Sequence, residues 1–470
     1  IYEEFLGKQP GVVYTPPYLV NFLLDEAMPL SIEETNFKIL DPACGSGVFL
    51  VGAFRRLIYR WRKKNKWNYP DLATLKKLLK ENIFGVELNK EAANLTIFSL
   101  SLALCDELTP LQIWKDLRFD DLHKENIIHD DFFNVISDKR LQKEFDLIIG
   151  NPPFEAKLTE AAKRVETVKG RERKISVLLD DNKTKDVPVK LPDNQIALLF
   201  LEQSIELCKK KGLVCLIQPS GPLLYNNSSF QFRQALLKSY NVPQIIDFTH
   251  ISRILFGKNG DVATAAIFIK NEKSKGKALL HVTVRRTKPH KEKLYFELDT
   301  YDFHHVPFIL ACSDSLIWKS NFLGGHRYHQ LVTRLKSLPT LKDYLHLKEK
   351  EGWAVSEGFT AATKGDKRKL DNFLKANNKL ELLKFKEKLE SPFLINKRFL
   401  PTEALTIEGI DNEQIQESLP TELFHSKGDS KIYEAPHVLI KEVITDGSIP
   451  IALSMEDLTF QRRIQWIFIF

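Results

Sequence analysis

Short apolar runs alternate with longer stretches of helical periodicity through the first 270 residues. Apolar runs of about four to eight residues are typical of buried strands, and apolar residues at helical spacing are typical of helices packed on a core. The pattern predicts helices over 48–60, 92–105 and 194–210, and strands over 38–40, 84–88, 127–129, 145–150, 213–218, 245–248 and 263–270. This alternation favours a doubly wound, mostly parallel α/β sheet.

Ligands of such sheets bind beyond the carboxyl ends of the strands. Chemistry is therefore expected directly after Leu40, Leu88, His129 and Gly150. The periodic pattern breaks down over residues 155–192, where charges of both signs crowd together. Because it follows a predicted site, this segment is expected to be either a mobile loop near that site or a solvated surface insertion.

The strand–helix alternation is lost from about residue 320. Short predicted strands at 393–399 and 437–441 flank polar loops, and residues 367–390 form a charged helical stretch. The chain is accordingly predicted to hold a catalytic domain over 1–320 and a mixed α+β domain over 321–470.

The composition is that of a globular protein, with 43% apolar and 27% charged residues among 470. This excludes long-range disorder, collagen and disulfide-stapled miniproteins. The net charge of +7 is weak evidence for a polyanionic partner, and +6 of it falls in residues 1–320. Five scattered cysteines without a CxxC pair favour a reducing compartment and no zinc site. No secretion signal or membrane span is visible, so a cytoplasmic protein without metal or membrane partner is expected.

A glycine-containing turn follows the first predicted strand and opens a helix. Its residues are Asp41, Pro42, Ala43, Cys44, Gly45, Ser46 and Gly47. Gly45 and Gly47 allow close approach of a ligand to the backbone, and the helix N-terminus favours a negative group. The turn lacks the GxGxxG pattern of a dinucleotide site. Glu87, at the end of the next strand, can accept hydrogen bonds from a ribose diol; alternatively it is an ordinary surface residue at a strand end.

The third predicted strand is followed by Asp130, Asp131 and Phe132. Either aspartate can accept a proton of an exocyclic amino group such as that of adenine, and Phe132 and Phe133 can wall the ring. We favour Asp131, because it directly precedes the phenylalanine.

The most specific motif is Asn151-Pro152-Pro153-Phe154, after the fourth strand. Two prolines remove backbone donors and fix φ, which leaves the Asn151 side-chain oxygen and the Pro152 carbonyl able to converge on one amino group. Two such acceptors draw the nitrogen lone pair out of conjugation, so that it can attack an electrophilic methyl. Phe154 offers a face on which a base can stack, worth about 1–3 kcal/mol. A purely structural turn is the weaker interpretation.

In combination, these motifs resemble the N6-adenine DNA methyltransferases in which the cofactor motif precedes the catalytic one (the gamma-type order), found in single-chain restriction–modification and phage-defence systems. The resemblance runs over about residues 1–270, from Tyr14-Thr15-Pro16-Pro17 to Thr264–Ile269. It implies a seven-stranded Rossmann-like methyltransferase sheet with S-adenosyl-L-methionine as cofactor. It also implies that Tyr14, Thr15 and Pro16 lie against the methionine part, with Thr15 at its carboxylate. From the residues alone, Thr15 is a possible helix N-cap.

The same resemblance implies methyl transfer to adenine N6 of a base flipped out of double-stranded DNA. It also implies partners in the form of restriction or specificity subunits of the same system. Residues 321–470 resemble a target-recognition region more loosely, and we expect this region to be incomplete. Its basic cluster is either a phosphate-contacting element or a solvated helix start; its members are Lys364, Lys367, Arg368 and Lys369.

Two rival hypotheses stay open. The same turn suits cytosine N4, guanine N2 in RNA or a glutamine amide in a protein, although the added C-terminal domain favours adenine in DNA. Alternatively the chain is a non-catalytic subunit that only positions DNA. Loss of Asn151, Gly45 or Gly47 would be expected of such a subunit, and all three are present.

Overall fold

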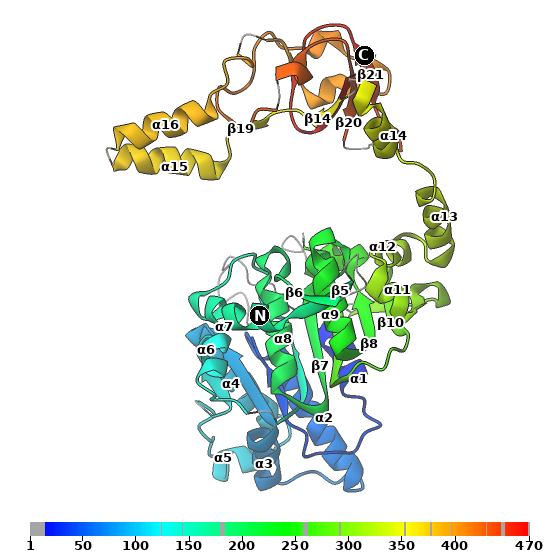
Figure 1. The fold of residues 1–470 in the computed structure, drawn as a ribbon. Coiled ribbons are helices and arrows are strands. Elements are labelled where there is room, and N and C mark those ends of the chain that lie inside the picture. Colours follow the sequence, from blue (N-terminus) through cyan, green and yellow to red (C-terminus); the bar gives the residue numbers. More distant parts are fainter. Residues whose placement is uncertain are drawn as a thin grey trace. The chain divides into compact units, whose positions relative to one another are not determined.

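The computed structural model describes residues 15–123, 125–142, 144–178, 184–256, 262–290, 293–351, 354–376, 378–395, 397–428, 430–442 and 447–468. The chain divides into two compact units between Val332 and Thr333 (Figure 1). We expected the division at residue 320. It comes later because residues beyond 320 still contact the first unit: Asn321 Nδ2 of α12 (Leu316–Leu323) lies 3.2 Å from His281 Nδ1, and Nε2 of the buried His329 lies 3.6 Å from Asp314 Oδ2.

The first unit is built on a sheet of nine strands, in the order β13-β10-β8-β9-β7-β4-β1-β2-β3. Neighbouring strands from β7 to β3 run parallel, whereas β9 is antiparallel to both β7 and β8. The expected doubly wound, mostly parallel α/β sheet is therefore confirmed. Its strands are β1 (Ile39–Asp41), β2 (Ile83–Glu87), β3 (Ile127–His129), β4 (Phe145–Gly150), β7 (Cys208–Pro219), β8 (Tyr240–Asp247), β9 (Thr264–Lys273), β10 (Leu279–Thr283) and β13 (Phe303–Val306).

The sheet has two strands more than the seven expected, because β10 and β13 continue it beyond β8. The sequence did not predict these two strands because histidines interrupt their apolar pattern. His281 interrupts the apolar run of β10, and His304 and His305 occupy half of β13. In the fold His281 is nevertheless completely buried. The pairing of β10 with β8 and of β13 with β10, not local hydrophobicity, makes these segments strands.

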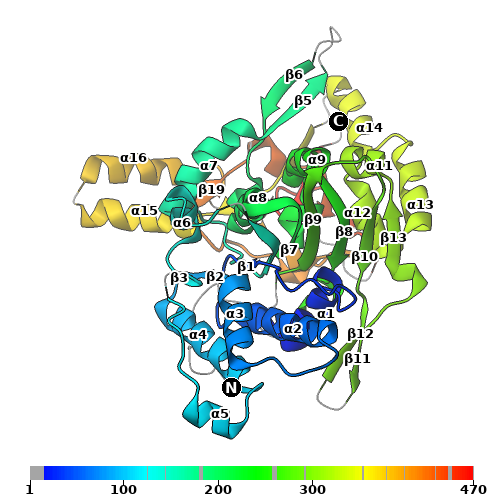
Figure 2. The same ribbon diagram turned by 90° about the horizontal axis from the view of Figure 1, so that it is seen from below.

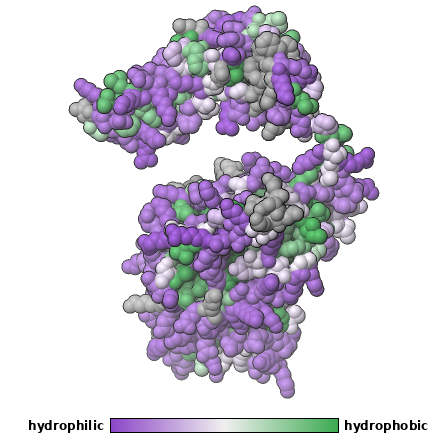
Figure 3. Space-filling model, in the orientation of Figure 1, coloured by the Kyte–Doolittle hydropathy of each residue, from purple (hydrophilic) through white to green (hydrophobic). Residues whose placement is uncertain are grey.

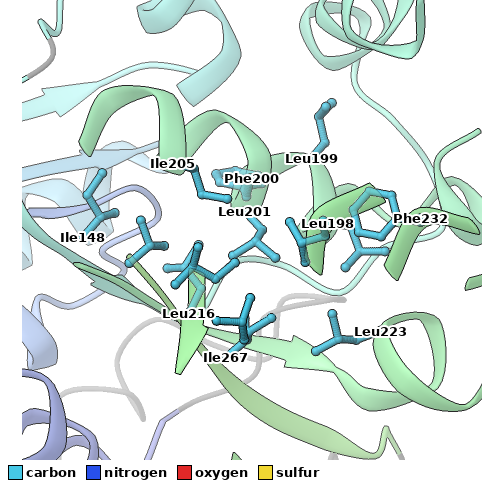
Figure 4. Packing of buried hydrophobic residues seen from close by; sticks show 14 of the residues in the cluster. Ile148, Leu198, Leu199, Phe200, Leu201, Ile205, Leu216, Leu223, Phe232 and Ile267 are labelled. Carbon is cyan, nitrogen blue, oxygen red and sulfur yellow. The ribbon is translucent and has the colours of Figure 1, made fainter. Parts of the chain in front are cut away.

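Helices cover both faces of the sheet (Figure 2). Alternate residues of the central strands enter two separate cores: Ile148 belongs to one, and Leu147 and Ile149 to the other. Figure 4 shows the first core, where Leu216 of β7 and Ile267 of β9 lie under Leu201 of α8. The helices of the unit are α1 (Pro17–Ala27), α2 (Val48–Lys64), α3 (Leu72–Asn82), α4 (Lys90–Cys105), α5 (Pro110–Lys115), α6 (Phe132–Ser137), α7 (Glu160–Glu172), α8 (Ile196–Leu207), α9 (Phe230–Ser239), α10 (Ser252–Phe256), α11 (Phe308–Ser313), α12 and α13 (His326–Lys336).

We expected residues 155–192 to be either a mobile loop near the site or a solvated surface insertion, and the described residues of this segment form regular structure. They contain α7 and a hairpin of β5 (Lys174–Leu178) with β6 (Thr184–Pro188). Arg173, between the two, is buried, and its guanidinium binds Glu202 of α8 with Nε–Oε1 at 2.7 Å and Glu166 with Nη2–Oε2 at 2.9 Å. The charge pattern misled only at Arg173, whose partners lie inside the protein, whereas Lys163, Arg164, Arg171 and Lys174 are exposed. A second hairpin pairs β11 (Arg286–His290) with β12 (Lys293–Glu297).

The second unit has a small core of its own around Phe359, Tyr433 and Phe460. The predicted strand at 437–441 is confirmed as β20, whereas only Phe399 of the predicted 393–399 is in a strand, because turns occupy 392–395. The predicted helical stretch 367–390 is two helices, which separate after Lys375. The elements are α14 (Leu341–Lys348), α15 (Lys364–Lys375), α16 (Lys379–Leu389), β14 (Ala354–Glu357), β15 (Thr360–Ala361), β16 (Phe399–Leu400), β17 (Leu405–Thr406), β18 (Gly409–Ile410), β19 (Phe424–Ser426), β20 (His437–Lys441), β21 (Ile451–Ser454), β22 (Thr459–Phe460) and β23 (Ile464–Phe468).

Four of these strands form one sheet in the order β14-β23-β20-β21, and the others pair in twos. Across the described parts of both units, no helix combines the length and the apolarity that crossing a membrane requires.

The Arg173 cluster generates a stability prediction. Arg173→Met would leave Glu202 buried without its cation, and we expect the free energy of unfolding to fall by about 3–5 kcal/mol. Urea denaturation followed by circular dichroism measures the change. The matched control is Arg164→Met on the exposed face of α7, which should cost less than about 1 kcal/mol. Equal effects of the two variants would contradict the role given to Arg173.

Candidate functional site

The strand order β4-β1-β2-β3 brings the predicted motifs to one place. Register pairs Leu40 of β1 with Ile148 of β4, and Asp41 with Gly85 of β2. Because these four strands are parallel, their carboxyl ends form one continuous rim of the sheet, which we call the carboxyl edge. The residues that follow these ends, in the turns 41–47, 87–89, 130–132 and 151–154, are therefore neighbours, although more than 100 positions separate the first from the last.

The turn after β1 is a tight glycine turn. Gly45 and Gly47 have φ of 54° and 82°, which favour glycine. A Cβ added at Gly47 would lie 2.8 Å from Thr96 Cγ2 of α4, so packing excludes a side chain there. A Cβ added at Gly45 would meet no described atom within 4 Å. Gly45 thus borders space that a ligand can enter, whereas Gly47 closes the turn against α4.

Three other residues of this turn have structural contacts. Pro42 and Cys44 are buried, and Ala43 is half-buried. The Cys44 amide donates to the Val86 carbonyl at 3.0 Å, and burial raises the pKa of the Cys44 thiol. The Cys44 backbone and side chain therefore hold the turn on β2, where a Cβ added at Gly85 would lie 2.9 Å from Cys44 Sγ.

Glu87 joins the turn to the end of β2. Its Oε2 accepts the Gly45 amide at 2.8 Å, and its Oε1 accepts the Asn89 amide at 2.8 Å. It is not the unattached surface residue of the weaker interpretation. Each carboxylate oxygen has a further lone pair, so the group can still accept hydrogen bonds from a ligand at Gly45.

Asp41 is almost completely buried at the end of β1. Its Oδ1 accepts the Ala43 amide at 3.0 Å, and a Cβ added at Gly150 would lie 2.3 Å from the same oxygen. Gly150 is therefore required by the approach of Asp41 to β4. Burial, with a smaller effect of the negative Glu87, raises the pKa of Asp41 to about 8.

The two aspartates after β3 have different partners. Asp131 caps α6, with Oδ1 accepting the Phe133 amide at 2.8 Å and Oδ2 accepting the Thr159 hydroxyl at 2.9 Å. Asp130 pairs with Arg140, whose Nη1 lies 2.6 Å from Oδ2. Both aspartates reach the carboxyl edge, and our preference for Asp131 stays a prediction.

Phe132 differs from its expected role. Its ring is buried and stacks on Phe200 of α8, with centroids 4.8 Å apart and planes at 7°. Phe133 is buried beside it. In this arrangement the two rings belong to the core under α8, and the expected aromatic wall for a ligand is not formed by their faces. The pattern misled because an apolar pair after a strand end is equally suited to open a buried helix.

The Asn151 turn contacts the start of α1. Asn151 Nδ2 donates to Thr15 Oγ1 at 3.0 Å, across 136 positions of sequence. Thr15 and Pro16 are buried, and the helix cap is Pro16 rather than Thr15, so the N-cap interpretation of Thr15 is wrong. Pro152 is buried, and Phe154 is half-buried against the core on the α1 and α2 face.

Pro153 and Tyr14 are the remaining predicted positions of the site. Pro153 is half-buried within the same turn. Tyr14 lies outside the described residues. Helix α1, which carries Thr15 to the site, is fixed in turn by Phe22, whose ring packs against Phe296 of β12 at 4.7 Å and Phe248 at 6.2 Å.

Gln218 is a polar residue at the carboxyl edge that the sequence motifs did not predict. It lies on β7, two positions beyond Leu216, which pairs with Gly150, so it is level with the Asn151 turn. The side chain is fully buried, and neither Oε1 nor Nε2 has a hydrogen-bond partner among the described residues. The signal in the sequence was a lone amide at the end of the apolar run 213–217.

Asp41 should make stability depend on pH. The unfolded carboxyl loses its proton near pH 4, whereas the folded one retains it up to about pH 8. Its stabilising contribution is complete below pH 4 and is lost as pH rises to 8, by up to about 1.4 kcal/mol per pH unit. Asp41→Asn should remove this slope in urea denaturation between pH 5 and 8. Parallel profiles of wild type and variant would contradict the raised pKa.

Gln218→Met should stabilise the protein. Replacing a buried, unpaired amide by an apolar side chain of similar shape removes a desolvation cost of about 1–2 kcal/mol. The control is Gln195→Met, because the Gln195 side chain caps α8 and its loss should destabilise by about 1 kcal/mol. Thermal and urea unfolding measure both. A stability loss in Gln218→Met would show that the amide has a partner.

Comparison with known proteins finds relatives among restriction-modification methylases and adenine-specific methyltransferases. Over 334 residues the chain is 25% identical to the type I restriction enzyme EcoEI methylase subunit of Escherichia coli. This alignment covers 68% of this chain and 57% of that protein. A stretch of 74 residues is 40% identical to the adenine-specific methyltransferase BrxX of Escherichia coli O9:H4 (strain HS), 15% of this chain and 6% of that protein. The chain thus spans about half or less of the length of these relatives.

A solved structure matches nearly the whole chain. The cryo-EM structure of the DrdV–DNA complex superposes with a TM-score of 0.57 at 12% identity, over 99% of this chain and 50% of that one, which shows a common fold. Residues 81–254 match the Eco57I restriction-modification methylase family. This segment runs from β2 through the Asn151 turn to α10. The resemblance inferred from the motifs is thereby confirmed, in that this segment is similar to the Eco57I restriction-modification methylases.

Proposed function

We propose that the chain is an S-adenosyl-L-methionine-dependent DNA methyltransferase that acts on adenine N6 within a restriction–modification or phage-defence system. The observation that carries this proposal is the Asn151-Pro152-Pro153-Phe154 turn. It follows β4 directly beside the glycine turn of β1. A methyl-donor site and an amino-group acceptor site are thus expected on adjacent strand ends.

The residues present fit the cofactor. Gly45 borders open space where a side chain is absent, and the Glu87 carboxylate lies beside it at the end of β2. We expect Glu87 to bind the ribose diol, Thr15 the methionine carboxylate, and Asp131 the adenine amino group. The cofactor would supply an electrophilic methyl on a sulfonium centre.

The chain's own residues would act on the target base by positioning. The Asn151 side-chain oxygen and the Pro152 carbonyl would accept the two N–H bonds of the adenine amino group. The protein fixes both acceptors in place. The Asn151 side chain donates a hydrogen bond to Thr15, and Pro152 is buried in the turn. Phe154 would stack on the base, which must leave the duplex because its amino group is inaccessible in the stack. Rate enhancement would then come mainly from holding the nitrogen in line with the methyl.

Adenine in DNA is supported over other amino-group substrates by the adenine-specific relative and by the presence of a second unit of more than 130 residues. Double-stranded DNA is the expected partner, and restriction or specificity subunits of the same system are further candidates. Transfer of a tritiated methyl group to DNA followed by nucleoside analysis separates N6-methyladenine from N4-methylcytosine.

Asn151→Ala provides the test of the catalytic proposal. Removing one acceptor that acts in the transition state should lower single-turnover methylation about 100-fold or more, while the Kd for S-adenosyl-L-methionine by calorimetry stays within about twofold. The matched control is Asn241→Ala at the start of β8, away from the carboxyl edge. It should methylate at the wild-type rate. Unchanged transfer by Asn151→Ala would overturn the assignment.

A further inference from the structure

The second unit concentrates its positive charge on one projection. We call the pair α15–α16, residues 364–389, the helical hairpin. It contains nine Lys and Arg against four Asp and Glu, a net charge of +5. The remainder of residues 333–470 contains twelve Lys and Arg against seventeen Asp and Glu, a net charge of −5. A unit that is neutral in total is therefore sharply divided in charge.

The cations of the helical hairpin are available to a partner. All nine side chains are exposed, and hydrophilic residues cover much of its surface (Figure 3). Among the residues that the structure describes, only Lys386 of the nine forms an ion pair, with Glu390 at 3.5 Å. The nine are Lys364, Lys367, Arg368, Lys369, Lys375, Lys379, Lys384, Lys386 and Lys388.

The helical hairpin is attached firmly at its base. Asp366 forms a capping box with Thr363, and its Oδ2 lies 2.8 Å from Nδ1 of His425 on β19. Leu389, at the end of α16, is buried in the same region. Between the helices, Phe373 packs edge-on against Phe385 with centroids 5.9 Å apart. The helical hairpin, which projects from its unit in Figure 1, is thus fixed to that unit by contacts at its base.

We propose that the helical hairpin is an arm that binds the phosphate backbone of DNA. This inference rests on the proposed function and specifies which part of the second unit meets the polyanion. A helix of twelve residues is about 18 Å long, and duplex DNA carries one negative charge per about 1.7 Å of axis, so the arm faces roughly ten phosphates. Flexible lysines bind phosphates as point charges and carry no sequence information, which suits an element that sets register.

The division of charge within the second unit favours one orientation of approach by DNA. The net-negative remainder of the unit repels DNA, while the helical hairpin attracts it, so approach from other sides is disfavoured. An acidic protein is the rival partner, and exposed leucines near the turn between the helices, Leu374, Leu380 and Leu383, would suit it. DNA is favoured because eight of the nine exposed cations form no ion pair among the described residues, and because the proposed reaction requires DNA.

The test neutralises four cations of the arm without touching its packing. The variant combines Lys367→Gln, Arg368→Gln, Lys384→Gln and Lys388→Gln; Lys369 is kept because it lies over the Phe385 ring. The matched control removes the same charge elsewhere in the chain, with Lys336→Gln, Lys350→Gln, Lys431→Gln and Arg463→Gln, all exposed. Circular dichroism and the Kd for S-adenosyl-L-methionine establish that each variant is folded.

Fluorescence anisotropy measures the binding of the full chain to a DNA duplex of arbitrary sequence. The duplex has about 40 base pairs, so that it is longer than the arm. The salt concentration is varied from roughly 50 to 200 mM, the range over which phosphate contacts dominate. The helical-hairpin variant should bind at least about tenfold more weakly at the lowest salt, and its slope of log K against log salt should fall by about 3. The control should change affinity by less than about twofold.

An unchanged slope in the helical-hairpin variant, with wild-type DNA binding intact, would overturn this inference alone and favour a protein partner. Equal losses in the variant and the control would also overturn it, since the effect would then be one of net charge. Absence of both DNA binding and methyl transfer in the wild type would overturn the proposed function together with this inference.

Discussion

The parallel alignment of β4, β1, β2 and β3 is the constraint on which the rest of the site depends. Parallel strands with both faces buried have their register fixed by two cores, and here Ile148 and its neighbours Leu147 and Ile149 point into opposite ones. A slip of one residue would exchange these faces. Because the register is fixed, the strand ends meet at one edge, and the Gly45 amide comes within 2.8 Å of Glu87.

Several contacts at this edge are costly, and the surrounding core maintains them. Gly45 and Gly47 adopt positive φ, Asp41 is buried with a raised pKa, and Gln218 has an amide without a partner among the described residues. Burial of the Asp41 carboxyl and of the Gln218 amide each lowers stability, and the positive φ values restrict those two positions to glycine. Their concentration at the ends of adjacent strands is typical of a site in which geometry for binding has been retained at the expense of stability.

The second unit illustrates why averages along a sequence can mislead. Its net charge suggested no strong interaction with a polyanion. The structure separates its charges: α15 and α16, which pack on one another, carry a net charge of +5, and the remainder of residues 333–470 carries −5. The helical hairpin could form away from the small core of its unit because the contact of Asp366 with His425 and the burial of Leu389 fix its base.

The sequence by itself determined the elements whose stabilisation is local or periodic. Seven strands of the sheet were visible because buried strands are continuous apolar runs, and the turns at 41–47 and 151–154 were visible because glycine and proline restrict the backbone directly. Only tertiary structure decided the rest. Strands β10 and β13 exist through pairing, although histidines interrupt their pattern. Arg173 appeared as a surface charge until α8 brought Glu202 to it, and Phe132 as a ligand wall until Phe200 stacked on it. In each case the partner lies far away in sequence, so the contact that fixes the residue's role cannot be read from its neighbours.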